Sequence, residues 1–235
     1  VNDTWMTDTG RALYKNIESE DRLIHYTIEG VHKASDEAAI AAAELLKSGN
    51  IAVVGSANSS VEEQFFYKAI AERSGAKVSL VSHRGDGDGL LQSEDRTPNL
   101  RGALVTGLIS ELPSENLEAL ARDINSGAVK TILAVNEDLT ELGISKDVLA
   151  KAKVIYVGSH ANRTSEVANI VLPSLMVFEK DGSFINQSFR IQRFKAAIPG
   201  PRGVQSDFMV LEKIAAALAG EKATAITIDS VWERM

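Results

Sequence analysis

The sequence predicts an α/β fold, in which helices flank a doubly wound, mostly parallel β-sheet. Short apolar runs such as residues 51–54 are typical of strands buried on both faces. These runs alternate with helical segments along most of the chain, which is the βαβ pattern of a parallel sheet. The 235 residues are 44% hydrophobic and 24% charged, a composition that allows a sizeable buried core.

The first predicted βαβ unit lies in residues 35–81. Ser35 is expected to cap a helix whose first turn holds acidic side chains and which stops near Gly49. The strand 51–54 follows it. A second helix, 61–73, then begins with a capping box and ends at Gly75. The residues expected on the buried face of this helix are Val61, Phe65, Ala69 and Ile70.

Beyond this unit the same patterns predict further strands at 77–81, 131–135, 154–157 and 169–172, with helices at 117–124, 145–151 and 207–218. Residues 83–101 form a Gly/Asp-rich connection that is long for a compact domain. The composition of 178–194 indicates an irregular loop with a short hairpin, and 222–235 a short strand or helix. The predicted organisation is an N-terminal arm (1–34), an α/β domain (35–220) and a C-terminal segment (221–235).

The net charge of −7 disfavours a nucleic-acid backbone as partner. Cysteine is absent, which excludes disulfides and thiolate ligands for iron–sulfur clusters or zinc within this chain. No apolar run approaches the length of a transmembrane helix, so direct membrane insertion is not expected. The chain begins with Val1 and not with Met, which indicates a fragment or a processed piece.

One candidate for cofactor binding is the turn between the strand 51–54 and the helix 61–73. Gly55, Ser56, Ala57 and Asn58 stand there, where exposed amides at a helix N-terminus can bind phosphate. The pattern matches neither of the common nucleotide-binding motifs, and no acidic residue follows the next strand to hold a ribose. An ordinary capped turn is the simpler interpretation.

A second candidate lies in residues 179–193, where two carboxylates and two arginines could form an acid/base pair. No nucleophile or set of metal ligands accompanies them, so a structural turn with solvated charges is preferred. Gly182 is expected to supply a backbone with φ > 0, while Asp181 and Asn186 bond to loop amides. Arg190 is expected to be structural as well. No catalytic or metal-binding residue is predicted.

Three segments resemble a known family. Residues 1–11 (VNDTWMTDTGR) are similar to a stretch in the large iron–sulfur subunit of NADH:quinone oxidoreductase, the 75 kDa subunit of respiratory complex I. Gly55, Ser56 and Ala57, followed by Glu62 and Glu63, resemble a βα turn of molybdopterin oxidoreductases. The third segment, which is the most specific, comprises 168–173 (ANIVLP), 179–186 (EKDGSFIN) and 190–192 (RIQ).

The sequence also departs from the family pattern, and these departures limit which cofactors the resemblance implies. Thr7 stands where many members have a cysteine that binds an additional iron–sulfur cluster, and a hydroxyl does not replace a thiolate there. No cysteine is available to bind molybdenum. The resemblance therefore implies a cofactor-free domain trimmed to a minimal form, with the iron–sulfur clusters in the missing N-terminal part of the parent subunit. Trp5 is expected to pack the N-terminal arm against the domain.

The leading functional hypothesis is thus a non-catalytic structural domain that supports electron transfer carried out elsewhere in the parent subunit. Its implied partners are the iron–sulfur domain of the same subunit and neighbouring peripheral-arm subunits. Its implied location is cytoplasmic, peripheral to the inner membrane. The chain alone is not expected to be an enzyme, although the parent complex is an NADH dehydrogenase. The alternative is a cofactor-binding fragment of a molybdopterin oxidoreductase such as formate dehydrogenase.

Overall fold

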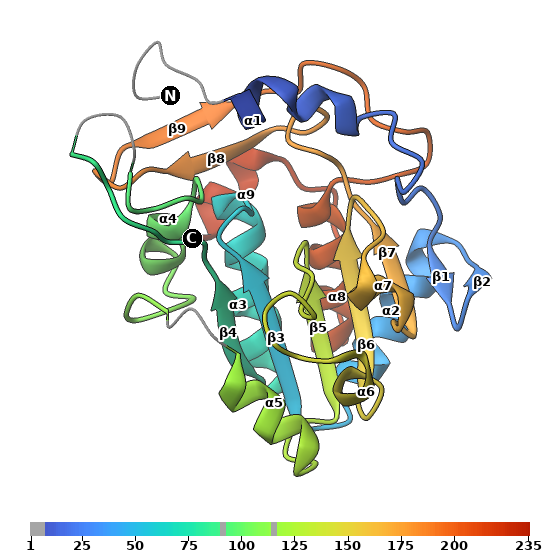
Figure 1. Ribbon diagram of the computed structural model, residues 1–235. Helices are drawn as coiled ribbons and strands as arrows, with labels where there is room; N and C mark the ends of the chain where they lie inside the picture. The colour runs from blue at the N-terminus through green and yellow to red at the C-terminus, as the bar shows by residue number, and fades with distance from the viewer. Residues whose placement is uncertain (1–7, 90–92, 114–116) are drawn as a thin grey trace.

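The computed structural model describes residues 8–89, 93–113 and 117–235. In this part of the chain a seven-stranded mixed sheet is flanked by helices, and a separate two-stranded hairpin lies apart from it (Figure 1). The predicted α/β class and mostly parallel sheet are confirmed. The strands are β1 (Thr27–Ile28), β2 (Val31–His32), β3 (Ile51–Ser56), β4 (Lys77–Val81), β5 (Thr131–Val135), β6 (Lys153–Gly158), β7 (Ile170–Pro173), β8 (Gly182–Ile185) and β9 (Ile191–Phe194).

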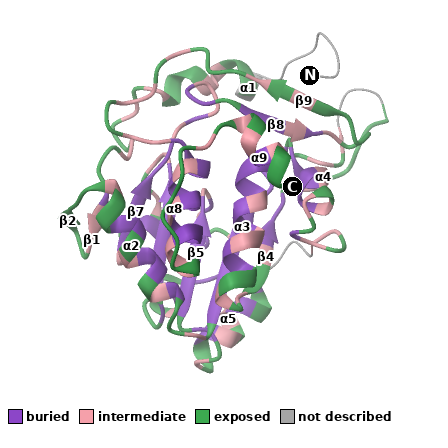
Figure 2. Ribbon diagram, turned by 180° about the vertical axis from the view of Figure 1, so that it is seen from behind, coloured by how far each residue is buried: buried purple, intermediate pink, exposed green. Residues whose placement is uncertain are grey.

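The large sheet has the order β2-β1-β7-β6-β5-β3-β4, and its strands from β7 to β4 run parallel. Helices cover both of its faces (Figures 1 and 2). The helices are α1 (Asp8–Ala12), α2 (Ser35–Leu46), α3 (Val61–Ser74), α4 (Leu100–Val105), α5 (Glu118–Asn125), α6 (Lys146–Leu149), α7 (Arg163–Glu166), α8 (Asp207–Ala219) and α9 (Ile228–Arg234), with a 3-10 turn, η1, at Leu13–Asn16. One core contains buried residues of α2, α3 and α8, and the other contains buried residues of α5 and α6.

Strand β3 shows why a continuous apolar run forms here. Ile51 and Val53 face the core under α2, α3 and α8, whereas Ala52 and Val54 face the core under α5 and α6. Because successive side chains point to opposite faces, a strand covered on both faces needs apolar residues at every position. All six residues of β3 are buried, which confirms the prediction for residues 51–54 and extends it to Gly55 and Ser56.

Helix α3 begins and ends as predicted, but the face it buries is different. Ser60 and Glu63 form the capping box, and Gly75 ends the helix with φ of 66°. Phe66 and Tyr67 are fully buried, while Phe65 is only partly buried. Val61 and Ile70 are buried as predicted, whereas Phe65 and Ala69 are only partly buried. The buried face is turned toward Phe66 and Tyr67, since α3 packs against α8 and the hairpin as well as against the sheet.

The N-terminal region, predicted as an arm, contains regular secondary structure. After α1 and η1, the strands β1 and β2 form a small hairpin, and β1 pairs antiparallel with β7 to extend the sheet. Ala34, and not Ser35, holds the N-cap position of α2, so that prediction is wrong by one residue. Trp5 and Thr7 lie outside the described residues, and what is expected of them stays a prediction.

The chain after β7 packs against the helices and the strand ends of the large sheet. The hairpin β8–β9 lies at the carboxyl ends of the parallel strands, near the start of α3, and α8 packs between α2 and α3 (Figure 1). The segment 222–235, expected as a short strand or helix, contains α9. Within the described ranges, no helix is both long enough and apolar enough to cross a membrane.

Candidate functional site

The carboxyl ends of the parallel strands form the place where a ligand is expected in this architecture. Strand β4 lies on one side of β3, and β5, the next strand of the large sheet along the chain, lies on the other. The strand order therefore reverses at β3, and open α/β sheets bind ligands outside such a reversal. The turn at Gly55–Ser60 lies at this edge.

The turn is built by close packing around Gly55. A Cβ on this residue would lie 3.0 Å from Cδ2 of the buried Tyr67, so a side chain at this position would crowd the aromatic ring. Ser56 and Ala57 are buried, and Asn58 is exposed. The Tyr67 hydroxyl lies 2.7 Å from Ser59 Oγ, which fixes the turn to the helix that follows it.

The amides of this turn are used within the chain. The amide of Ala57 donates to the carbonyl of Val81, and the amide of Asn58 donates to Ser56 Oγ. The amide of Ser60 donates to Glu63 Oε2 at 2.8 Å through the capping box. A phosphate at a helix N-terminus needs such amides as donors, and here a carboxylate already accepts from one of them.

A second carboxylate, Glu137, lies at the same edge, just beyond β5. It accepts a hydrogen bond from Ser56 Oγ through one oxygen, and its other oxygen lies 3.4 Å from His83 Nε2. Burial raises the pKa of Glu137 above its ordinary value, although the Ser56 and His83 contacts oppose the rise. His83 follows β4 and its side chain is half exposed. This group therefore presents a buried acid and an accessible imidazole, without the acid–imidazole–hydroxyl order of a hydrolase triad.

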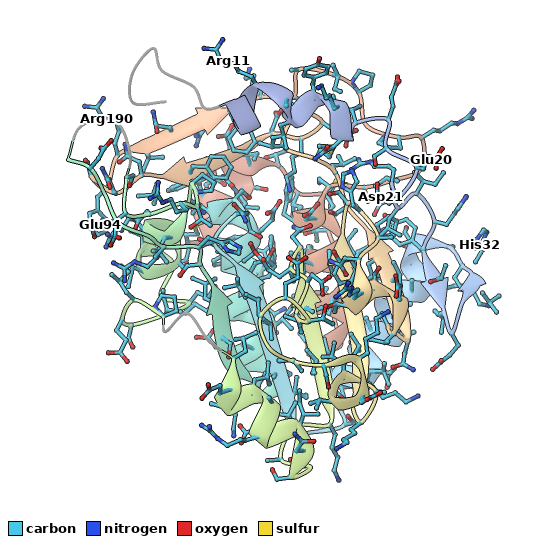
Figure 3. The ribbon with its side chains drawn as sticks, in the orientation of Figure 1. Arg11, Glu20, Asp21, His32, Glu94 and Arg190 are labelled. Carbon is cyan, nitrogen blue, oxygen red and sulfur yellow. The ribbon has the colours of Figure 1, made fainter. Side chains whose placement is uncertain are left out.

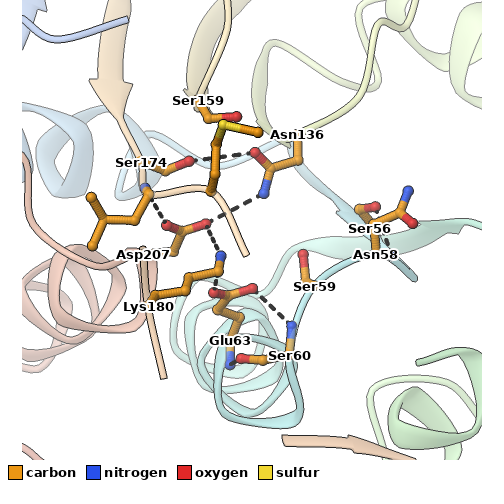
Figure 4. A network of polar contacts seen from close by, with 12 residues as sticks. Ser56, Asn58, Ser59, Ser60, Glu63, Asn136, Ser159, Ser174, Lys180 and Asp207 are labelled. Carbon is orange, nitrogen blue, oxygen red and sulfur yellow. Dashed lines mark hydrogen bonds and ion pairs between the residues drawn. The ribbon is translucent and has the colours of Figure 1, made fainter. Parts of the chain in front are cut away.

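A buried triad of charged residues, Glu63, Lys180 and Asp207, lies near this turn (Figure 4). Lys180 Nζ lies 2.6 Å from Glu63 Oε1 and 3.1 Å from Asp207 Oδ2. Both carboxylates have fully buried side chains, and the side chain of Lys180 is 8% exposed. Each group comes from a different part of the chain, since Glu63 is in α3, Lys180 precedes β8 and Asp207 begins α8.

The carboxylates of the triad are held by further polar contacts. Asp207 accepts from the Leu175 amide at 3.2 Å and from Asn136 Nδ2 at 3.3 Å. Asn136 follows β5 with φ of 56°, and its Oδ1 lies 3.5 Å from Ser174 Oγ. The triad thus joins the ends of β5 and β7 to two helices and to the loop before β8.

The triad holds two acids and one base, and burial together with this imbalance shifts the pKa values of Glu63 and Lys180. Burial raises the pKa of Glu63 to about 7; Lys180 opposes the rise and Asp207 adds to it. Burial lowers the pKa of Lys180, but the charges of Asp207 and Glu63 outweigh burial and raise it overall. Lys180 therefore stays protonated, and burial favours the protonated form of Glu63.

Glu179 forms a second buried ion pair next to the triad. Its carboxylate pairs with Arg22, and the same oxygen accepts from the Met176 amide at 2.8 Å. The side chains of Arg22 and Glu179 are 6% and 2% exposed. The prediction that the charges of this segment are solvated is wrong for Glu179 and Lys180, because both have partners distant in the sequence.

The two other polar residues of the first turn of α3 also make structural contacts. Glu62 accepts from the Ser183 amide at 3.0 Å and from Trp232 Nε1 at 2.8 Å. Gln64 donates to the carbonyl of Asn99 at 3.1 Å. The motif at the start of α3 therefore anchors the hairpin, the C-terminal helix and the connection that follows β4.

Gly182 is required here for space and not for φ > 0, which corrects the prediction made from sequence. The glycine has no positive φ and lies in β8. A Cβ on it would lie 2.5 Å from Phe194 Cζ and 3.1 Å from Ser60 Cβ. The positive φ lies instead at Phe189.

The short side-chain bonds expected in this segment are present. Asp181 Oδ1 accepts from the Ala196 amide at 2.8 Å. Asn186 Oδ1 accepts from the amides of Ser188 and Arg190. The Arg190 side chain is exposed and points away from the body of the protein (Figure 3).

Sequence reasoning singled out Gly55 to Asn58 and the segment from Glu179, and the structure brings both to the same edge of the sheet. It missed Glu137, Asp207 and Arg22, whose roles depend on contacts between distant segments. An isolated Asp after a Ser resembles an ordinary helix start, so no local signal marks Asp207 as buried. Over the residues that the structure describes, no group of three or more His, Asp or Glu side chains could hold a metal ion.

Comparisons with known proteins agree with this architecture. The family model described as "Molybdopterin oxidoreductase" matches residues 15–217. Among curated proteins, subunit alpha of an F420-dependent formate dehydrogenase 2 from Methanococcus maripaludis is 33% identical over 73 residues, which are 31% of this chain and 11% of that protein. The mitochondrial 78 kDa subunit of the NADH-ubiquinone oxidoreductase of Neurospora crassa is 32% identical over 78 residues, which are 33% of this chain and 10% of that protein.

One solved structure shows the fold over most of the chain. It is a chain of the formyltransferase/hydrolase complex from Methylorubrum extorquens, with a TM-score of 0.60 and 12% sequence identity. The match covers 83% of this chain and 99% of that one. At this identity the likeness concerns the fold alone. The curated matches, in contrast, span only about a tenth of those two relatives.

Proposed function

This chain belongs to the molybdopterin oxidoreductase family, and we propose that it is a non-catalytic structural domain of a multi-subunit oxidoreductase. The parent that we propose is the large iron–sulfur subunit of an NADH:quinone oxidoreductase. In this role the domain supports electron transfer by clusters located elsewhere in the subunit. Its partners would be the iron–sulfur domain of that subunit and neighbouring peripheral-arm subunits.

The proposal rests on the contacts of the family motif, whose polar side chains bind other segments of this same chain. Glu62 and Glu63, which follow the turn, bind the hairpin, the C-terminal helix and Lys180. The segment from Glu179, the other family motif, supplies Lys180 and packs Gly182 against Ser60. Both motifs are therefore engaged with one another, and their polar groups are committed to holding the fold.

The cofactor that gives the family its name does not fit the residues present. A phosphorylated pterin needs amide donors at the turn, but the amides of Ala57, Asn58 and Ser60 have acceptors within the chain. Glu63 and Glu137 occupy the same edge with two buried side chains that are already bonded to Lys180 and Ser56. The chain also has no cysteine to bind molybdenum. No reaction step is assigned to this cofactor.

The complex I branch is favoured by residues 1–11, whose sequence resembles that subunit. Local identity to a relative of that type is 32%, close to the 33% to a formate dehydrogenase. A cofactor-binding fragment of a formate dehydrogenase is therefore the second candidate. It is favoured by the position of the turn at the reversal of strand order, beside the accessible His83.

The two candidates can be separated by producing the chain in a host that makes the molybdenum cofactor. Molybdenum is measured by mass spectrometry and pterin by its fluorescence after oxidation, and a formate dehydrogenase made in the same host is the positive control. We expect neither molybdenum nor pterin at a stoichiometric level. Stoichiometric pterin that is lost in Asn58→Glu, which adds a negative charge at an exposed position of the turn, would overturn the structural role and support the second candidate.

A tagged chain, expressed from its own locus, tests the positive side of the proposal. We expect iron-containing oxidoreductase subunits to co-purify with it. If the folded chain purifies without them, the proposed membership in such a complex is wrong.

A further inference from the structure

The segment between Asp181 and Asp207 differs in charge from the rest of the molecule. The whole chain has 32 acidic residues and a net charge of −7, yet no acid occurs in residues 182–206. This segment carries four basic residues, all exposed: Arg190, Arg193, Lys195 and Arg202. The segment therefore carries a local excess of positive charge in an acidic protein.

The tip of the β8–β9 hairpin also breaks a local rule of turn chemistry. The loop runs from Asn186 to Arg190, and Phe189 adopts φ of 57° within it. Hairpin loops place Gly or Asn at such left-handed positions, because a bulky side chain is strained there. The strained Phe189 is nevertheless 55% exposed, and its ring has a cation–π contact with Arg101 at 5.8 Å. A bulky residue that keeps a strained positive φ, although its side chain gains no burial, is typical of functional sites.

Phe189 is followed along the chain by other exposed side chains. We call Phe189, Arg190, Ile191 and Arg193 the hairpin patch. Ile191 is 51% exposed and follows the tip on β9. Arg193 pairs with Asp229, whereas for Arg190 the structure gives no ion pair within the described residues. The side chain of Arg190 extends away from the body of the protein (Figure 3).

We propose that the hairpin patch is a docking surface for a partner protein whose own surface is acidic and contains an apolar recess. Phe189 enters the recess, and carboxylates of the partner pair with Arg190. This inference rests on the proposed function, because it assigns the face by which the structural domain joins its complex. Ile191 extends the apolar contact along β9.

The chemistry of the patch favours a protein over a membrane or a nucleic acid. Exposed aromatic residues and arginine are enriched at protein interfaces and supply most of their binding energy. Adsorption to an anionic membrane usually needs a cluster of about four or more cations. In the patch Arg193 is already paired with Asp229, so its two arginines fall short of such a cluster. Two arginines, one of them paired, also supply too few cations to follow a nucleic-acid backbone.

The test uses the tagged chain in its native complex. Ile191 is replaced by the photo-crosslinker p-benzoylphenylalanine, and the crosslinked peptides are sequenced. Phe189→Gly and Arg190→Glu are compared with Ile40→Gln, which changes an equally exposed apolar residue on α2. Thermal unfolding of each variant is measured in parallel, because Phe189→Gly relieves strain and should not lower stability.

We expect a crosslink to an acidic segment of one other subunit. Phe189→Gly and Arg190→Glu should each reduce recovery of that subunit by about tenfold or more, without loss of thermal stability, and Ile40→Gln should not. Replacing an acidic residue of the crosslinked segment by Arg should restore binding to Arg190→Glu. This charge-swap rescue separates specific docking from adventitious capture.

Several outcomes would overturn the inference. They are the absence of a crosslink, a crosslink confined to this chain or to a second copy of it, and unchanged recovery of the partner with both patch variants. Flotation of the wild-type protein with vesicles of phosphatidylcholine and phosphatidylglycerol, lost in Arg190→Glu, would assign the patch to a membrane instead. A rescued partner that is no oxidoreductase subunit would retain the docking surface and refute the proposed function.

Discussion

Lys180 of the buried triad and Arg190 of the hairpin patch lie close together in the sequence, but their charges are used in opposite ways. Lys180 lies between two carboxylates in the interior, and each of these has further hydrogen bonds. Arg190 extends into solvent from a strained loop in an acid-free segment. A basic side chain therefore stabilises the fold where its acidic partners belong to the same chain, as for Lys180. In the proposed docking surface Arg190 instead takes its partners from another molecule.

Removing the cation of the triad should destabilise the protein most. Lys180→Met leaves Glu63 and Asp207 buried together without their cation, so the free energy of unfolding should fall by about 3–5 kcal/mol. Chemical denaturation measures this loss. The triple variant Lys180→Met, Glu63→Gln, Asp207→Asn removes all three charges and should recover part of it. If Lys180→Met alone unfolds like the wild type, the triad does not hold the fold.

The next effect concerns Gly182, which joins the two regions. Gly182→Ala places a methyl group against Phe194 and Ser60, and should cost about 1–3 kcal/mol of unfolding free energy. Adding Phe194→Leu removes the clashing ring tip and should recover part of the loss. If Gly182→Ala costs the same free energy of unfolding with and without Phe194→Leu, then a contact other than the one with Phe194 causes the loss.

The third effect is a dependence on pH that only the buried region should show. The pKa of Glu63 is raised from 4.5 to about 7, so the folded state holds a proton that the unfolded state releases in this window. The free energy of unfolding should therefore fall as the pH rises through the window, with a contribution from this group of no more than about 1.4 kcal/mol per pH unit. Denaturation at several pH values measures the slope.

The variant Glu63→Gln should flatten that slope, whereas Glu72→Gln, at an exposed position of the same helix, should not change it. A slope that stays the same in Glu63→Gln would assign the proton to another group. Glu137, whose pKa burial also raises, is then the one to test by Glu137→Gln.

Substitutions in the hairpin patch should change stability least. Phe189→Gly replaces a strained residue by one that accepts φ > 0, and should raise the free energy of unfolding by up to about 1 kcal/mol. Arg190→Glu should change it by less than about 0.5 kcal/mol. Thermal unfolding that shows a clear loss in either variant would mean that the tip serves the fold, and the contrast with the triad would disappear.

The sequence predicted those parts of the molecule whose causes are local. The strand Thr131–Val135, the capping box of Ser60 and Glu63, and the stop at Gly75 depend on residues a few positions apart, and all three are present. The choice of Phe66 over Phe65 as the buried ring depends on what packs against α3, which the sequence pattern alone does not specify.

The candidate site was predicted less well, for the same physical reason. The position of the turn at Gly55 follows from the order of strand and helix. The burial of Lys180 does not, because its partners are 117 and 27 residues away. Gly182 shows the difference most clearly, since a glycine needed for φ > 0 and one needed for space look the same in a sequence.

The span of these contacts also bears on how the chain folds during synthesis. Glu63 leaves the ribosome 117 residues before Lys180, and Glu62 leaves 170 residues before Trp232. During that interval the acidic first turn of α3 lacks Lys180 and Trp232, its partners in the folded state. The helix can form, but it cannot yet pack fully into the core. Completion of the fold is thus a late event, which also requires α8 and the C-terminal helix that carries Trp232. Ribosome stalling before this point would leave an incompletely packed intermediate for chaperones to bind.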